Sequence, residues 1–391
     1  MRPTAPLPAP LAAGLLSLAF ACVLPALAFA QAFQTKAGQA ILVDHSTGTV
    51  LYQKNADDPI PPASLAKLMT MEVVFDQLSQ GRISLDETFP ISEKAWREGG
   101  SNSGGSTMFA RLNSEVAVED LIRGVIIQSG NDASIALAEG IAGTEESFVR
   151  LMNERARAIG MRDSTFRNVT GLTDPEQLVT LRDMIVLARH LFETYPDFYE
   201  LYSEPEFTWN GIRQPNRNPL LGDARLGVDG LKTGFTDASG YALVASAENE
   251  GERLFMAVSG LESSRDRERE SRALMTWGTR QFDRERLFEP GDVVAEARVY
   301  GGTQRTVPLT AASAIDIFLP QAGRNDLEAR AVYEGPIEAP IRRGDTLGVL
   351  RVTRGDEVTQ ETPLVAAEDV RVGPIYLRAL DAAQEAVTFW R

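Results

Sequence analysis

Cysteine and histidine are nearly absent from this sequence. Its 391 residues include one cysteine, Cys22, and two histidines, His45 and His190. Cys22 lies in an apolar leader that we expect to be removed, so disulfides, thiolate metal sites and a cysteine nucleophile are excluded from the mature chain. His45 falls in a predicted turn and His190 in a predicted helix, and a zinc site or a Ser-His-Asp triad would have to recruit one of them. Any catalysis is therefore expected to proceed without histidine.

Positively charged residues are also fewer than negatively charged ones. Asp and Glu outnumber Lys and Arg by 54 to 39, which gives a formal net charge of -15. Phosphate backbones are bound by clustered Lys and Arg, so this balance excludes nucleic acid as a partner. Hydrophobic residues make up 43% of the chain, enough for a sizeable core, and the length predicts two domains.

The first thirty residues have the composition of an export signal. Arg2 precedes an apolar stretch over 11–27, and residues 28–30 read Ala-Phe-Ala. This order predicts a signal peptide that is cleaved before Gln31. The alternative is a buried or membrane helix, and a lipoprotein acylated at Cys22 is disfavoured because more apolar sequence follows.

The periodicity of the chain predicts an α+β domain. Alternating residues around a Ser-Thr-Gly turn predict a β-hairpin over 39–55, and consecutive antiparallel strands follow over 226–261. Helical spacing predicts further helices over 61–81, 118–127, 132–142, 144–159, 181–194 and 264–283. The terminal strands can then share one antiparallel sheet, against which the middle helices form a cluster. The Gly- and Ser-rich stretch over 98–110 is expected to be a loop that packs little of itself.

The C-terminal part has a different sequence pattern. Short alternating segments over 288–372 predict a small all-β sandwich, a spacer or interaction module. The last stretch, 373–391, predicts an amphipathic helix with one apolar face made of Tyr376, Leu380, Ala383, Val387 and Trp390. Such a helix can lie in a membrane interface, and the alternative is that it docks on the protein's own surface.

Three short motifs carry the chemistry. They are Ser64-x-x-Lys67, Ser129-Gly130-Asn131 and Lys232-Thr233-Gly234. Each is weak alone, but this order is the signature of penicillin-binding proteins and class A β-lactamases. The predicted context agrees with it, because the first motif opens a helix, the second joins two helices and the third begins a strand.

Longer stretches around these motifs narrow the resemblance. "PASLAKLMT", "IQSGNDAS", "FTWNGIRQPNRNPLL", "VDGLKTGFTDASGYALVASA" and "ALMTWG" resemble the low-molecular-mass D-alanyl-D-alanine carboxypeptidases of the penicillin-binding protein 5 and 6 type. The resemblance covers nearly the whole mature chain. It implies a signal peptide over 1–30, a serine β-lactamase/DD-peptidase-like catalytic domain over 31–287, an all-β domain over 288–372 and a membrane-anchor helix over 373–391.

The same resemblance implies a function. Such enzymes are exported, lie on the periplasmic face of the inner membrane and remove the last D-alanine from peptidoglycan stem peptides ending in D-Ala-D-Ala. They are inhibited covalently by β-lactam antibiotics and need no metal or cofactor.

The residues themselves suggest how the reaction begins. A serine hydroxyl attacks an amide carbonyl only if a base takes its proton, and without histidine the candidate base is Lys67. Lys67 must be neutral for this, and burial together with the charge of Lys232 is expected to lower its pKa. The backbone N–H of Ser64 would face the developing oxyanion.

By resemblance, further residues complete the catalytic centre. Ser129 would relay a proton to the departing D-alanine, and Asn131 would hold Lys67 and the substrate amide. The backbone N–H of Phe235 would be the second oxyanion donor. Phe235 departs from the best-known member of the family, which has histidine there, and this affects how fast the acyl-enzyme is hydrolysed and how it responds to pH.

Other residues are expected to bind the substrate's terminal carboxylate. By resemblance, Lys232 and Thr233 of the Lys-Thr-Gly234 strand would grip it, with Arg217 and Arg267 nearby. Arg267 lies in a charged predicted helix, where a solvated face is the alternative.

Other functions on the same fold remain open at this stage. A β-lactamase would need a deacylating carboxylate near the ester, and no Glu-x-x-Leu-Asn-like stretch occurs between residues 160 and 180. A DD-endopeptidase and a slow-turnover penicillin-binding scaffold at the membrane are the remaining alternatives.

Overall fold

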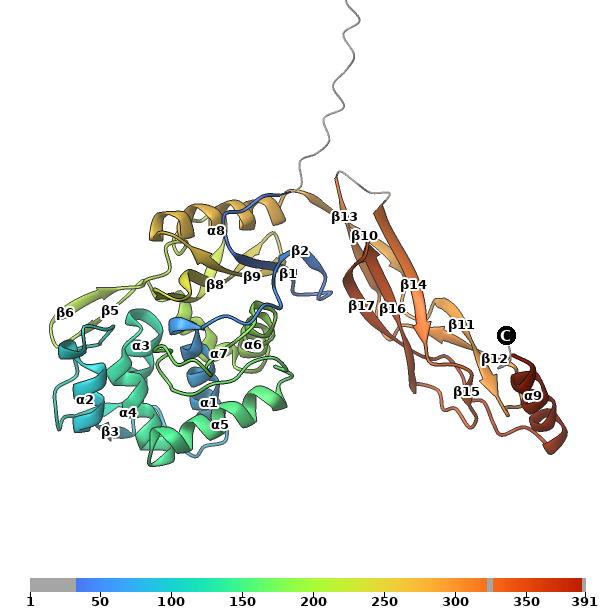
Figure 1. Ribbon diagram of the computed structural model, residues 1–391, viewed down its shortest axis with the longest axis horizontal. Helices are drawn as coiled ribbons and strands as arrows, with labels where there is room; N and C mark the ends of the chain where they lie inside the picture. Colours follow the sequence, from blue (N-terminus) through green and yellow to red (C-terminus); the bar gives the residue numbers. More distant parts are fainter. Residues whose placement is uncertain (1–32, 322–325, 389–391) are drawn as a thin grey trace, which may run out of the picture. The chain divides into compact units, whose positions relative to one another are not determined.

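The computed structural model describes residues 33–321 and 326–388 (Figure 1). The predicted signal peptide, residues 1–30, lies outside the described residues.

A five-stranded antiparallel sheet forms the centre of the first part. Its strands run in the order β2-β1-β9-β8-β7. Their bounds are β1 (Gln39–Asp44), β2 (Val50–Lys54), β7 (Val228–Thr236), β8 (Gly240–Asn249) and β9 (Glu252–Leu261). The N-terminal hairpin therefore pairs with a strand more than two hundred residues later, as the sequence predicts, and β7 lies at the edge of the sheet.

Helices cover both faces of this sheet (Figure 1). Alternate strand residues divide between two cores: Ile41, Val244 and Phe255 face one, while Leu42 and Leu243 face the other. One face packs against a cluster of α1 (Lys67–Ser79), α2 (Glu93–Gly99), α3 (Val118–Gln128), α4 (Asn131–Ala142), α5 (Glu145–Ala158), α6 (Leu181–Thr194) and α7 (Pro196–Tyr199). The other face packs against α8 (Ser264–Gly278). These observations confirm the predicted fold class.

Helix α1 is the centre of the cluster. All of its residues from Lys67 to Gln77 are buried, so it has no solvent face over most of its length. A helix that is buried nearly all round is typical of a core position, with packing on every side. A lysine at the start of such a helix is therefore held away from water.

The Gly- and Ser-rich loop over 98–110 packs more closely than predicted. The buried Asp132 carboxylate accepts hydrogen bonds from Thr107 Oγ1 at 2.7 Å, Met108 N at 2.9 Å and Ala110 N at 3.1 Å. The expectation that this loop packs little was wrong, because one buried carboxylate organises its second half. Two small two-stranded sheets were not predicted: β3 (Thr88–Pro90) with β4 (Glu115–Ala117), and the hairpin of β5 (Glu206–Trp209) with β6 (Ile212–Pro215).

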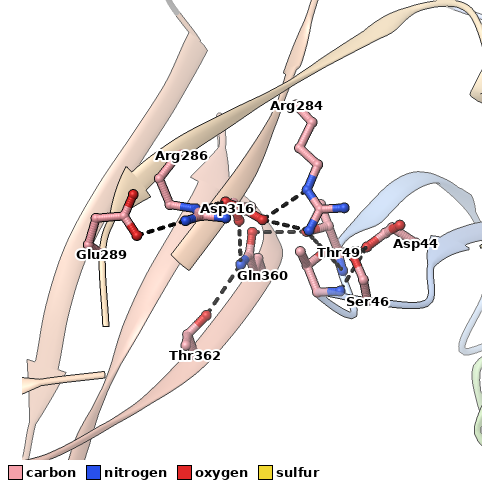
Figure 2. Close-up of polar contacts among 10 residues, drawn as sticks. Asp44, Ser46, Thr49, Arg284, Arg286, Glu289, Asp316, Gln360 and Thr362 are labelled. Carbon is pink, nitrogen blue, oxygen red and sulfur yellow. Dashed lines mark hydrogen bonds and ion pairs between the residues drawn. The ribbon is translucent and has the colours of Figure 1, made fainter. Parts of the chain in front are cut away.

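The second part is all β, as expected. β10 (Phe282–Phe288) pairs with β13 (Ile315–Pro320). A six-stranded sheet contains β14 (Leu327–Tyr333), β16 (Thr346–Arg354), β17 (Glu357–Ala366), β12 (Thr306–Thr310), β11 (Val293–Tyr300) and β15 (Ile337–Glu338), in that order. Figure 2 shows how β10 is fixed to β13: Arg284 and Arg286 both bond the buried Asp316 carboxylate, whose pKa they lower. Gln360 of β17 donates to the Asp316 carbonyl at 3.1 Å.

A helix follows the β-rich part, within the range 373–391 predicted for it, of which 389–391 lie outside the described residues. α9 (Ile375–Thr388) begins after Pro374, and the backbone N–H of Gly301 donates to Asp381 Oδ2 at 2.8 Å. The acidic side of α9 therefore faces the β-rich part, at the end of β11.

Candidate active site

Ser64 lies in a short 3-10 turn, Ala63–Ala66, directly before α1. Ala63 adopts a φ of +48°, a strained conformation that non-glycine residues rarely take. Lys67 is the first residue of α1, and its Nζ lies 3.3 Å from Ser64 Oγ. The structure thus places the lysine amine within hydrogen-bond reach of the serine hydroxyl.

Lys67 is fully buried, and its pKa is lowered to about 7. Burial is the largest cause, the charge of Arg217 adds to it, and the Asp132 carboxylate opposes both. We expected the charge of Lys232 to lower this pKa; the repulsion between the two lysines instead lowers the pKa of Lys232, and Arg217 is the positive neighbour that lowers the pKa of Lys67. Near neutral pH a large share of Lys67 is consequently unprotonated, as a general base requires.

The backbone carbonyl of Thr170 is the second partner of Lys67. Lys67 Nζ donates to this oxygen at 2.5 Å. Thr170 lies in the loop between α5 and α6 and was not among the predicted site residues. No sequence signal could have identified it, because the contact uses the main chain, which every residue type provides.

Ser129 and Asn131 end one helix and begin the next. Ser129 takes a left-handed conformation, φ +62°, at the C-terminus of α3, and Asn131 is the first residue of α4. Both are buried, and Ser129 Oγ has no hydrogen-bond partner within the described residues. Among the described residues, the hydrogen-bond partners of Lys67 Nζ are Ser64 and Thr170. The expected hydrogen bond between Asn131 and Lys67 is not formed.

The Lys-Thr-Gly motif lies on the edge strand β7, beside the serine turn. Lys232 and Thr233 are buried. A side chain on Gly234 would place its Cβ 3.2 Å from Ala63 Cβ and 3.2 Å from Leu65 Cγ, which is tighter than ordinary packing. Glycine here lets the strand approach the turn that carries Ser64.

Three cationic side chains gather at this strand. Burial lowers the pKa of Lys232 well below its usual range, and the charges of Lys67, Arg217 and Arg267 lower it further. Arg217 Nη1 donates to Ser106 Oγ at 2.5 Å, while Arg267 lies with its guanidinium carbon 5.7 Å from the centre of the Tyr241 ring. Crowded cations of this kind favour an anionic ligand, since it would relieve their mutual repulsion.

Arg267 differs from its neighbours on α8. Arg269 and Arg272 of the same helix pair with carboxylates. The Nε of Arg267 is buried and has no hydrogen-bond partner within the residues that the structure describes. The alternative of a solvated face therefore does not describe Arg267. Its guanidinium lies over the Tyr241 ring, and its charge lowers the pKa of Lys232.

Phe235, directly after the motif, presents its ring to solvent. Its side chain is 47% exposed and packs on Tyr241, with ring centres 4.2 Å apart. A phenyl ring has no group that accepts or donates a proton, so Phe235 can contribute packing and its backbone N–H, but not acid-base chemistry.

The geometry defines a class of enzyme. A serine at the head of a buried helix, a partly neutral lysine one turn on and a cationic edge strand together form a serine acyl-transfer site with a lysine base. Over 33–321 and 326–388, no group of acidic, histidine or cysteine side chains is arranged to hold a metal ion.

Comparison with known proteins gives the family. Residues 26–263 match the family described as D-alanyl-D-alanine carboxypeptidase, and residues 282–372 match the C-terminal domain of penicillin-binding protein 5. The chain is 40% identical over 343 residues to D-alanyl-D-alanine carboxypeptidase DacC of Escherichia coli (strain K12), covering 87% of this chain and 86% of that protein. It belongs to the D-alanyl-D-alanine carboxypeptidase family of serine peptidases.

Solved structures agree with this assignment. Penicillin-binding protein 5 from Haemophilus influenzae matches with a TM-score of 0.74 and 37% identity, covering 87% of this chain and 99% of that one. Penicillin-binding protein D2 from Listeria monocytogenes, solved in its ampicillin-bound form, matches with a TM-score of 0.56 and 30% identity, covering 64% of this chain and 100% of that one.

Proposed function

We propose that this protein is a serine-type D-Ala-D-Ala carboxypeptidase that works through an acyl-enzyme on Ser64. Neutral Lys67 takes the Ser64 hydroxyl proton as Oγ bonds to the carbonyl carbon of the penultimate D-alanine. The N–H groups of Ser64 and Phe235 stabilise the oxyanion. The carbon–nitrogen bond then breaks, and the leaving D-alanine takes a proton relayed through Ser129. Water hydrolyses the remaining ester.

The cationic cluster explains why the enzyme would act at a chain end. Lys232, Arg217 and Arg267 crowd one region, and a terminal carboxylate would supply the missing negative charge. A carboxylate at that point places the last peptide bond beside Ser64. The single observation that carries the proposal is this pairing of a lysine-activated serine with a cluster of cations.

The same chemistry accounts for β-lactam binding. A β-lactam offers a strained amide and a carboxylate, so Ser64 can open the ring as it opens the peptide bond. A β-lactamase would next need a carboxylate to activate water. The loop that reaches Lys67 presents the Thr170 carbonyl instead, and a carbonyl cannot take a proton from water. This observation disfavours a β-lactamase whose deacylating carboxylate lies in this loop.

Release of D-alanine tests the function. Purified residues 31–391 are expected to release D-alanine from a peptide ending in D-Ala-D-Ala, and the Ser64→Ala variant is expected to release none. Equal release by the variant, or none by the parent, would contradict the mechanism. If the parent cleaves cross-linked stem peptides and leaves the linear peptide intact, it is an endopeptidase.

We further propose that the protein is exported and lies peripherally on the periplasmic face of the inner membrane through α9. The exposed fractions of Ile375 and Tyr376 are 81% and 69%. Meanwhile Asp381 of the same helix bonds Gly301 of the protein. A polar side turned inward and exposed apolar residues support an interfacial helix more than one docked by its apolar face. No described helix is long and apolar enough to cross a bilayer.

Vesicle binding tests the anchor. Residues 31–391 are expected to partition onto vesicles that contain anionic lipid, and deletion of 374–391 is expected to abolish this binding, because the exposed apolar side of α9 is lost. Replacing Ile375 and Tyr376 with serine should weaken binding while leaving D-alanine release unchanged. Equal partitioning of the full and shortened chains would count against the anchor.

A further inference from the structure

The loop that holds Lys67 is built around two side chains. Asn168 Oδ1 accepts from Gly171 N at 2.7 Å, Thr170 Oγ1 at 3.1 Å and Thr170 N at 3.2 Å. Asn168 Nδ2 donates to Leu172 O at 2.9 Å. One asparagine therefore closes the turn over 168–172 from inside, a role that Asn performs well because its amide mimics a backbone group.

Gln177 also holds the same turn, through hydrogen bonds to its backbone. It is buried, and its Oε1 accepts from the backbone N–H groups of Arg167 and Asn168 at 2.9 and 3.0 Å. Its Nε2 donates to Leu172 O at 3.1 Å. The turn is thus tied at its first and last residues, and the carbonyl between them has a fixed direction.

That carbonyl belongs to Thr170 and faces the base. Lys67 Nζ lies between Thr170 O at 2.5 Å and Ser64 Oγ at 3.3 Å. A carbonyl oxygen can only accept, so it takes one N–H of the amine. A neutral lysine amine has two N–H bonds and one lone pair. Because one N–H is donated to Thr170 O, the lone pair is free to face the serine hydroxyl.

We propose that Asn168 is a positioning residue for the reaction: by fixing the Thr170 carbonyl, it directs the lone pair of Lys67 toward Ser64. The inference rests on the acyl-transfer function proposed above. Asn168 touches neither the hydroxyl nor the amine, and acts only through the direction of the Thr170 carbonyl. The carbonyl also stabilises the ammonium form more than the amine, because a hydrogen bond to a charged donor is the stronger one.

The experiment measures acylation of Ser64 by a chromogenic cephalosporin across pH, in full-length protein. In Asn168→Ala we expect the maximal rate constant to fall about 10- to 100-fold, because the lone pair loses its direction. We also expect the acidic limb of the profile to move down by about half a pH unit or more, because the ammonium loses its best acceptor.

A second substitution at the same position is expected to shift the acidic limb of the pH profile in the opposite direction. Asn168→Asp keeps oxygen acceptors for Thr170 and Gly171, so the maximal rate should stay within about threefold of the parent. Its negative charge favours the ammonium form of Lys67, so the acidic limb should move up. Asp174→Ala is the matched control: Asp174 accepts from Glu176 N at 2.8 Å in the same loop and bonds neither Thr170 nor Gly171.

The outcomes separate this inference from its alternatives. If Asn168 has a purely structural role, Asn168→Ala should show a smaller amplitude of acylation and a lower melting temperature. The acidic limb of its pH profile should then coincide with those of the parent and of Asp174→Ala. This result would overturn the proposal. So would an upward shift in Asn168→Ala. Absence of acylation in the parent would instead refute the proposed function.

Discussion

Lys67→Met is expected to slow acylation of Ser64 by about 100- to 10,000-fold, the range over which a general base contributes to catalysis. The substitution removes the amine and leaves an unbranched apolar side chain that is one heavy atom shorter. Because Lys67 is fully buried, an apolar replacement avoids the cost of desolvating a polar group. The variant should therefore unfold at the same temperature as the parent or a higher one, as measured by thermal denaturation.

The pH profile of the parent gives the same prediction a second test. The pKa of Lys67 is about 7, so its neutral fraction rises as the pH rises through that value. Acylation should rise with it, with an acidic midpoint near 7, and this limb should be missing in Lys67→Met. Lys36→Met, at a lysine whose side chain is 68% exposed, is the control and should match the parent. Retention of rapid acylation by Lys67→Met would exclude Lys67 as the base.

Gly171→Ala is expected to lower the acylation rate on the order of 100-fold, the loss that a displacement of about 1 Å can cause at an active site. Gly171 has a φ of +81°, and an added Cβ would lie 1.8 Å from the carbonyl oxygen of Ala63. The clash involves backbone atoms, so it can be relieved only by moving the loop or the turn that carries Ser64. Stopped-flow measurement of acylation would report the change.

A matched glycine separates the clash from backbone strain. Gly143 has a similar φ of +77°, and nothing lies within 4 Å of its added Cβ. Both alanine variants should lose about 1 to 2 kcal/mol of unfolding free energy from the left-handed conformation. Gly143→Ala should nevertheless acylate at the parent rate. Equal rates in the two variants would show that the packing of Gly171 on Ala63 is not needed for catalysis.

The sequence predicted the architecture because its signals are local and consistent. Alternation around residues 46–48 and again over 226–261 predicted the strands, and the order of elements then allowed the first and last of them to share a sheet. The three motifs fall where the predicted elements meet. Their side chains carry the chemistry, so residue type alone was informative.

What sequence could not predict depends on packing between distant segments. Thr170 contributes through its carbonyl, which no residue type reveals. Asp132 follows the second motif directly, but its role in folding the loop over 98–110 depends on a close approach of that loop to α4. That Arg217 joins Lys232 as a positive neighbour of Lys67 also depends on three-dimensional distance.

The position of β7 at the end of the sheet order bears on which substrates the enzyme can accept. A peptide that aligns with a free strand edge is held by its main chain, and main-chain hydrogen bonds are the same for every residue. Discrimination then falls on the terminal carboxylate and the residues next to it. We therefore expect release of D-alanine to depend little on the residues further along the stem, as a series of peptides varied at those positions would measure.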